Sequence, residues 1–186
     1  MNALLNANPF LKEVVAHTAG GEKILRCLQC GTCGGSCPSG PDMDHTPRAL
    51  FALAMAGERD EVLRSNAPWY CVSCYYCTVR CPQGIPITEI MYSLKRLSVR
   101  AGLCDDSAAP DFSETFVGWV ERYGRSFELG LATQYHLQHS PLRKMGHGPL
   151  ALGLLLKDRL AFRPSRIKGM SQLKAILKKA KALEGA

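Results

Sequence analysis

The sequence predicts an all-α protein built around two cysteine-rich loops. Apolar residues recur at helical spacing in several segments, and no segment alternates apolar and polar residues for long enough to indicate a sheet. Asparagine, threonine and proline precede these segments and glycine follows them, as expected at helix ends. Eight of the nine cysteines fall into two clusters, which is too many for packing alone. The composition therefore indicates metal or disulfide chemistry within a helical fold.

The first hundred residues are expected to form four helices. Three of them have apolar residues at helical spacing, the one through Val62-Leu63 is a shorter turn of helix, and a glycine or proline follows each. The predicted helices run from Asn8-Pro9 to Gly20-Gly21, from Thr46-Pro47 to Gly57, through Val62-Leu63 to about Asn66, and from Ile87 to Gly102.

A basic helical extension is expected after a linker at residues 105–110. Asp111 and Glu114 resemble a capping box that opens a helix ending at Gly124. Further helices are predicted over 126–138 and 150–156, and a last one is capped by Ser171. The net charge of +7 is concentrated here, with nine basic residues and one acid over 157–181. We expect two domains, 1–104 and 105–186, and the second to pack on the first or to dock a partner.

The two cysteine clusters are repeats of one pattern. Cys-x2-Cys-x2-Cys-x3-Cys-Pro begins at Cys27 and recurs 44 residues later from Cys71. This run binds cubane [4Fe–4S] clusters, and its fourth cysteine ligates the other cluster, since three thiolates on one tight loop leave one iron corner open. The predicted ligands are Cys27, Cys30, Cys33 and Cys81 for the first cluster, and Cys71, Cys74, Cys77 and Cys37 for the second.

Other interpretations of these residues are weaker. Structural zinc usually takes two separated pairs of ligands, and disulfides are rare in the cytoplasmic setting that we expect for a chain without a secretory leader. Cys104 lies outside both runs and is expected to be structural. His45 is expected to be a loop or capping residue, and the aromatic pairs Trp69-Tyr70 and Tyr75-Tyr76 to shield the second cluster.

Three function classes are not favoured. No stretch reaches the length of a membrane-spanning helix, and no glycine-rich phosphate or dinucleotide motif is present. The basic extension alone is a poor indication of nucleic-acid binding.

Three segments carry a resemblance to a known family. Residues 26–38, 42–48 and 69–82 resemble the C subunit of heterodisulfide reductases, including the related protein of bacterial sulfur-oxidising complexes. The resemblance is strong over about residues 10–103. It implies an α-helical ferredoxin domain with two [4Fe–4S] clusters. It also implies electron relay between a flavoprotein (A) subunit and a thiol/disulfide-active (B) subunit, which has a Cys-Cys-Gly signature. This chain has neither adjacent cysteines nor a flavin fingerprint, so we expect no catalysis by the chain alone.

Two alternatives keep the clusters but change the role. One is the iron–sulfur subunit of a succinate dehydrogenase or fumarate reductase-like enzyme, which also carries a plant-type cluster domain. This sequence has no C-x4-C-x2-C run of that kind. The other is a free dicluster ferredoxin, but such proteins tend to be shorter and acidic.

Overall fold

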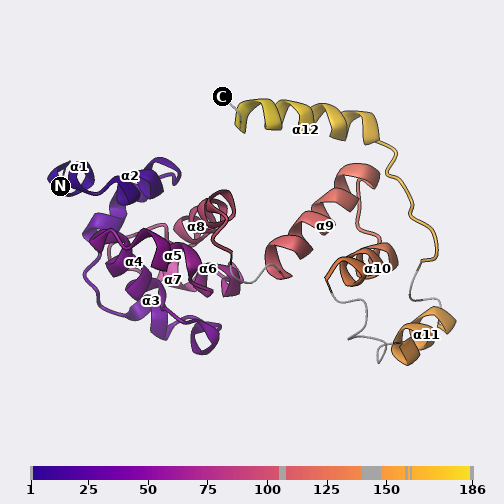
Figure 1. The fold of residues 1–186 in the computed structure, drawn as a ribbon, viewed down its shortest axis with the longest axis horizontal. Coiled ribbons are helices and arrows are strands. Elements are labelled where there is room, and N and C mark those ends of the chain that lie inside the picture. Colours follow the sequence, from indigo (N-terminus) through magenta and orange to yellow (C-terminus); the bar gives the residue numbers. More distant parts are fainter. Residues whose placement is uncertain (1, 105–107, 140–147, 158, 160, 185–186) are drawn as a thin grey trace. The chain divides into compact units, whose positions relative to one another are not determined.

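The computed structural model describes residues 2–104, 108–139, 148–157, 159 and 161–184 (Figure 1). The chain divides into two compact units, residues 1–106 and 107–186. Across the described ranges the regular elements are all helices and no residue is in a strand, so the predicted all-α class is confirmed.

The first unit contains eight α-helices and two 3₁₀ turns in its described part. The four predicted helices are all present, but the first ends at Ala16, before the predicted stop at Gly20-Gly21. The elements are α1 Asn2–Ala7, α2 Pro9–Ala16, η1 Gly21–Arg26, α3 Thr32–Gly35, η2 Gly40–Asp42, α4 Pro47–Ala56, α5 Arg59–Arg64, α6 Ala67–Tyr70, α7 Tyr76–Val79 and α8 Ile87–Ala101.

The helix ends are fixed by the residues that the sequence offers for capping. The side chain of Asn8 accepts a hydrogen bond from Leu11 N (2.9 Å) at the start of α2. Its amide also donates to the carbonyls of Ala54 (2.8 Å) and Met55 (3.1 Å) at the end of α4. Asn8 thus satisfies orphan groups of two helices at once. Gly57 adopts the left-handed conformation that closes α4 (φ 88°).

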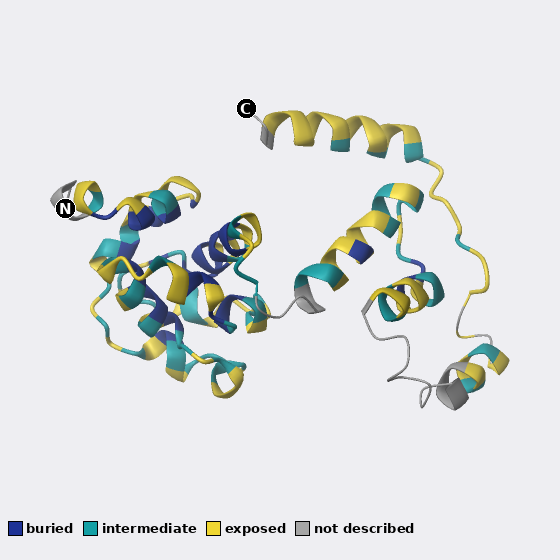
Figure 2. Ribbon diagram, in the orientation of Figure 1, coloured by how far each residue is buried: buried dark blue, intermediate teal, exposed yellow. Residues whose placement is uncertain are grey.

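Helix α8 buries one face. It packs on α5, α6, α7 and α2, and its buried side chains belong to the core of this unit, which Figure 2 shows in dark blue. Two buried serines on α8 are bonded across the core. Ser98 Oγ donates to the carbonyl of Leu63 at 2.6 Å, and Ser93 Oγ donates to His17 O at 2.8 Å. These bonds fix α8 against α5 and against the end of α2.

The second unit has few buried residues. It contains α9 Ala108–Tyr123, α10 Glu128–His139, α11 Gly148–Leu156 and α12 Met170–Glu184. Helices α9 and α10 pack together around the buried Phe127 and Leu131. The ring of Trp119 lies 5.3 Å from that of Phe127. Helix α12 packs on α9, where Lys181 and Glu121 form an ion pair at 2.8 Å.

Two sequence-based expectations for this unit were wrong. Helix α9 begins at Ala108, inside the expected linker, because proline is tolerated in a first helical turn and Pro110 does not delay the helix. Asp111 is therefore a helical residue and not the cap. Helix α12 begins at Met170, so Ser171 is its second residue.

Candidate metal centre

The two cysteine runs have the same backbone conformation. One turn of helix lies in each, α3 and α7, and these two turns are equivalent in the 44-residue repeat. Before each turn, Gln29 and Ser73 both have φ 56°. The next left-handed positions are Gly31 (φ 81°) and Tyr75 (φ 63°). Glycine is relaxed in that conformation, whereas tyrosine is strained, so the second run adopts this shape against its side-chain preference.

The hydrogen bonds of the two runs also repeat. The fourth cysteines, Cys37 and Cys81, donate through their N–H groups to Gly34 O (3.1 Å) and Thr78 O (3.3 Å). Each then accepts at its own carbonyl from the N–H of Gly40 or Gly84, at 3.1 Å in both runs. These bonds place the fourth cysteine of each run beyond its helical turn, at the side of the other run.

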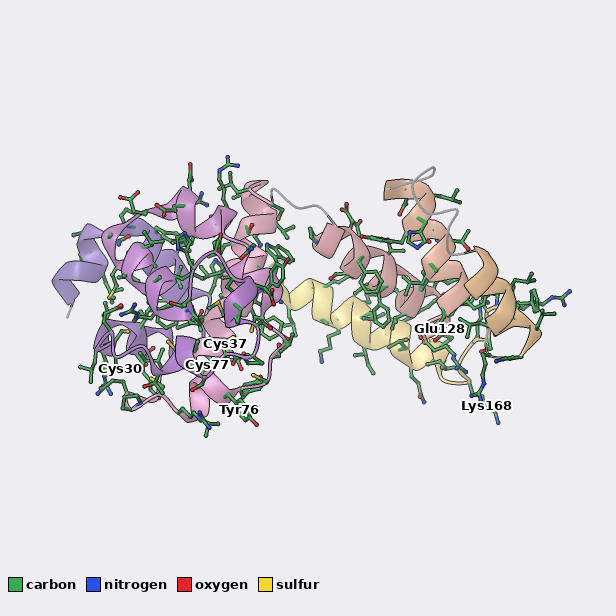
Figure 3. The ribbon with its side chains drawn as sticks, turned by 90° about the horizontal axis from the view of Figure 1, so that it is seen from below. Cys30, Cys37, Tyr76, Cys77, Glu128 and Lys168 are labelled. Atoms are coloured by element: carbon green, nitrogen blue, oxygen red, sulfur yellow. The ribbon has the colours of Figure 1, made fainter. Side chains whose placement is uncertain are left out.

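Two cavities lie beside the runs, and each is lined by cysteines from both. The first contains three cysteines of the first run and the last of the second, Cys27, Cys30, Cys33 and Cys81. The second contains three cysteines of the second run and the last of the first, Cys71, Cys74, Cys77 and Cys37. Figure 3 shows Cys37 close to Cys77, although they come from different runs. Each predicted set of four cysteines therefore lines one of the two cavities.

The thiols differ in their surroundings within each cavity. Cys33 is buried, Cys77 is half-buried, and burial raises the pKa of both because it disfavours a charged thiolate. Cys30 is exposed, and hydrogen bonds from the side chain and backbone of Thr32 lower its pKa. A buried thiolate requires positive charge beside it, which iron supplies when it binds.

The grouping of four thiols around each cavity suits a cubane cluster. A single zinc ion is held by ligands that each lie about 2.3 Å from it, so its sulfurs are close together. Among the residues that the structure describes, no three Cys, His, Asp or Glu side chains converge in this way. In a cubane, each thiolate binds its own iron, so four thiols around one space are the required arrangement.

Sequence reasoning missed several residues that line the cavities. Arg48 and Phe51 of α4 line the first, and Thr88 and Met91 of α8 line the second. The signal for them was available, since Arg48 and Thr88 are each the second residue of the helix that follows a run. The two are matched by their place in the helix and not by the 44-residue period, because α4 begins at Pro47 and α8 at Ile87.

The other residues named in the sequence analysis differ in their relation to these cavities. Cys104 lines neither cavity, and its sulfur lies 3.4 Å from Ser98 Oγ. Tyr75 lines the second cavity and its hydroxyl donates to Glu89 at 3.0 Å. Tyr76 is 56% exposed and stacks under Arg80, so it does not line the cavity. His45 is a loop residue whose Nε2 lies 3.5 Å from Glu61.

A polar clasp that the sequence did not reveal joins the loop after the first run to the start of α6. Asp44 accepts hydrogen bonds from Ser65 Oγ (2.6 Å) and Asn66 N (3.0 Å), and Asn66 Oδ1 accepts from Asp44 N (2.9 Å). Partial burial of Asp44 acts to raise its pKa, but these bonds and one from His45 N outweigh it and lower the pKa. The clasp connects the two repeats just before the second run.

Comparison with known families shows what part of this unit is similar to. Residues 23–85 match the family described as 4Fe-4S dicluster domain. That range contains all eight cysteines of the two cavities. The N-terminal unit therefore contains a segment that is similar to 4Fe-4S dicluster domains. This similarity favours iron–sulfur chemistry over disulfides at its cysteines.

Curated relatives of the dicluster domain belong to reductases. The chain is 46% identical over 84 residues to the C subunit of the ferredoxin:CoB-CoM heterodisulfide reductase of Methanosarcina mazei, covering 45% of this chain and 52% of that protein. It is 42% identical over 86 residues to an iron-sulfur C subunit of the CoB-CoM heterodisulfide reductase of Methanocaldococcus jannaschii, covering 44% and 46%. The resemblance predicted from the sequence is confirmed for this part of the chain.

The similarity has a limited extent. A third relative, the C subunit of the H(2):CoB-CoM heterodisulfide,ferredoxin reductase of Methanothermobacter thermautotrophicus, is 38% identical over 84 residues, covering 45% of each protein. The chain spans about half the length of the curated relatives it matches.

Across the described residues, none of the helices has the length and apolar character needed to cross a bilayer.

Proposed function

We propose that this chain is the iron–sulfur subunit of a heterodisulfide reductase-type complex and carries two [4Fe–4S] clusters. Cys27, Cys30, Cys33 and Cys81 hold the first, and Cys71, Cys74, Cys77 and Cys37 hold the second. The observation that carries this assignment is the lining of each cavity by three cysteines of one run and the fourth of the other. The names of the relatives support the type of complex.

The role that follows is electron relay without catalysis by this chain alone. A [4Fe–4S] cluster, when bound, takes up and returns single electrons. The packing of α3 on α7 supports two adjacent sites, because each of these helices lies within one cysteine run. We propose that electrons pass between a flavoprotein partner and a Cys-Cys-Gly partner, which acts on the thiol or disulfide. The free thiols required for cluster assembly fit a cytoplasmic location.

Two exposed apolar residues support docking at the mouths of the cavities. Leu28 lines the first cavity and Val72 the second, and they are equivalent in the repeat. Both side chains are 65% exposed. Apolar side chains this exposed beside a redox site favour a contact surface for a partner protein. We assign one mouth to each partner.

The basic extension is proposed as a further docking element. On α12, Ile176 and Leu183 are 65% and 72% exposed beside Lys178, Lys179 and Lys181. An apolar face with basic neighbours suits a partner surface that is apolar and acidic.

The test is anaerobic purification with and without the partners. The protein should contain about eight iron and eight sulfide ions, show the broad absorbance of cubane clusters, and co-purify with the Cys-Cys-Gly partner when both are expressed. One zinc ion per run without such absorbance overturns the cluster assignment. Two clusters in a protein that exchanges electrons with neither the flavoprotein nor the Cys-Cys-Gly protein overturns only the proposed complex.

A further inference from the structure

The two cavities are related by the repeat, but the groups that face their sulfurs are different. Corresponding cysteines of the two runs have similar exposure: Cys27 and Cys71 are both half-buried, Cys30 and Cys74 are both exposed, and only the third pair differs, with Cys33 buried and Cys77 half-buried. Solvent exposure therefore does not separate the two sites strongly. What separates them is hydrogen bonding to the thiols and nearby charge, which together with exposure set the reduction potential of a cluster.

The first difference is between Gln29 and Ser73. These residues share one backbone conformation and follow the first cysteine of each run by two positions. The amide Nε2 of Gln29 donates to the sulfur of Cys27 at 3.4 Å. Ser73 has no such contact, since its hydroxyl pairs with the hydroxyl of Tyr92 at 2.6 Å. The first site gains a sulfur-directed donor that its counterpart lacks.

The second difference is between Thr32 and Tyr76, the first residues of α3 and α7. Thr32 Oγ1 lies 3.4 Å from the sulfur of Cys30. A cysteine that binds iron is a thiolate and has no proton to give, so the threonine must be the donor. The equivalent Tyr76 instead stacks with the guanidinium of Arg80, 5.5 Å from the ring centroid.

The third difference is between Arg48 and Thr88, the second residues of α4 and α8. Arg48 lines the first cavity with a permanent positive charge, and its Nη1 lies 3.5 Å from Gln29 O. Thr88 lines the second cavity with a neutral hydroxyl 3.9 Å from the sulfur of Cys77. That hydroxyl is shared with Thr78 Oγ1 at 3.2 Å.

A cation also lies beside the second site. Lys95 Nζ is 3.5 Å from the carbonyl oxygen of Cys71 and faces the rings of Trp69 and Tyr92, at 5.9 Å and 5.2 Å. It does not line the cavity, and its proton is directed to a carbonyl and not to a sulfur. Its effect on the second site is therefore smaller than that of Arg48 on the first.

From these contrasts we infer that Gln29, Thr32 and Arg48 make the first site the more easily reduced of the two. Reduction adds one negative charge, which spreads onto the thiolates, and donors and cations at the sulfurs stabilise that charge. One electron given to the pair by a reductant then resides at the first site and leaves the second oxidised. The inference rests on the proposed function, because it presupposes a cluster in each cavity.

A redox titration of the full chain monitored by electron paramagnetic resonance tests this order. Cys30→Ser and Cys74→Ser, each of which alters one site, assign the two midpoint potentials. The first site is expected to have the higher midpoint. Gln29→Ser, Thr32→Val and Arg48→Thr should each lower it, the triple variant most, and leave the other midpoint in place. Thr88→Val should lower only the second midpoint.

The control is Arg59→Thr, which removes a cation of the same kind from α5, where it pairs with Glu13 and lines neither cavity. Neither midpoint should move. A higher midpoint at the second site, or a triple variant with unchanged midpoints, overturns the inference while the relay function stands. A purified chain that holds no pair of clusters overturns the proposed function, and this inference with it.

Discussion

Arg80 donates a hydrogen bond from its Nη1 to Ser36 Oγ at 3.2 Å, and these two residues occupy the same position in the two cysteine runs. Each stands immediately before the fourth cysteine of its run. This contact therefore joins the ends of the two runs at equivalent positions. The next residues, Cys37 and Cys81, line the cavity of the opposite run.

Exchanging a fourth cysteine should damage the cluster of the other run. In Cys37→Ser, the cavity with Cys71, Cys74 and Cys77 loses a ligand, so iron should fall from about eight to about four or five per chain. Its spectrum should match that of Cys74→Ser and differ from that of Cys30→Ser. Cys104→Ser is the control and should keep all its iron. A Cys37→Ser spectrum that matches Cys30→Ser contradicts the assignment.

Removing the clusters should destabilise the first unit more than the second. Each cluster connects residues of both runs and binds only the folded chain, so its binding energy adds to stability. After oxidative removal of iron and chelation, we expect residues 1–106 to lose protection from proteases. The α9–α10 pair has no cysteine ligands and should be unchanged. Limited proteolysis with mass spectrometry measures this. Equal protection of residues 1–106 with and without iron contradicts it.

The Asp44 clasp should stabilise the fold in a pH-dependent way. Asp44 has a lowered pKa, so its contribution is complete above the ordinary carboxyl pKa and is lost as the pH falls through the lowered value. Asp44→Asn should cost about 1 kcal/mol at pH 7, a small value because the side chain is largely exposed, and less at pH 3. Unfolding rates in denaturant after pH jumps measure the difference. A cost that is the same at pH 7 and at pH 3 contradicts this role of Asp44.

Replacing Asn8 should weaken the junction of α2 and α4. Asn8→Ala removes a helix cap and leaves the carbonyls of Ala54 and Met55 without their donor in a buried position. The expected loss is about 2 to 3 kcal/mol in the free energy of unfolding, measured in denaturant. Asn6→Ala, on the exposed side of α1, should change stability by less than about 0.5 kcal/mol. Equal effects of the two variants contradict the capping role.

Charging the two cavity mouths should separate the partners. Leu28→Asp and Val72→Asp replace equally exposed residues and touch no ligand bond, so both variants should keep their clusters. Each should slow electron exchange with one partner about tenfold, corresponding to about 1.4 kcal/mol of contact energy, and leave exchange with the other unchanged. Stopped-flow kinetics with each purified partner measures this. If one variant slows both exchanges, a single shared docking site is indicated.

The sequence was most informative where a side chain acts locally. Asn8-Pro9, Thr46-Pro47 and Gly57 predicted helix ends correctly, because a cap or a left-handed glycine depends on a few neighbours. The cysteine spacing predicted the groups of four that the structure places around each cavity. The one-turn helices α3 and α7 were missed, since four residues are too few to show a period.

Contacts between residues far apart in the sequence could not be predicted from the sequence. The clasp joins Asp44 and Asn66, which are 22 positions apart, and both are common polar residues. No local sequence pattern therefore predicts it. The packing of α12 on α9 was also missed. The exposed face of α12 gives a helical period but does not say which surface its half-buried Leu173 and Leu177 contact.

The exchange of fourth cysteines also has a consequence for how the protein is made. During synthesis, three of the four cysteines of the first cavity are present once Cys33 has been added, and the fourth, Cys81, is the last cysteine of the second run. The second cavity has its first cysteine, Cys37, early, and its set of four is complete only when Cys77 has been added. A truncated product ending between the runs therefore closes neither cavity, and iron delivery to the nascent chain cannot be finished one half at a time.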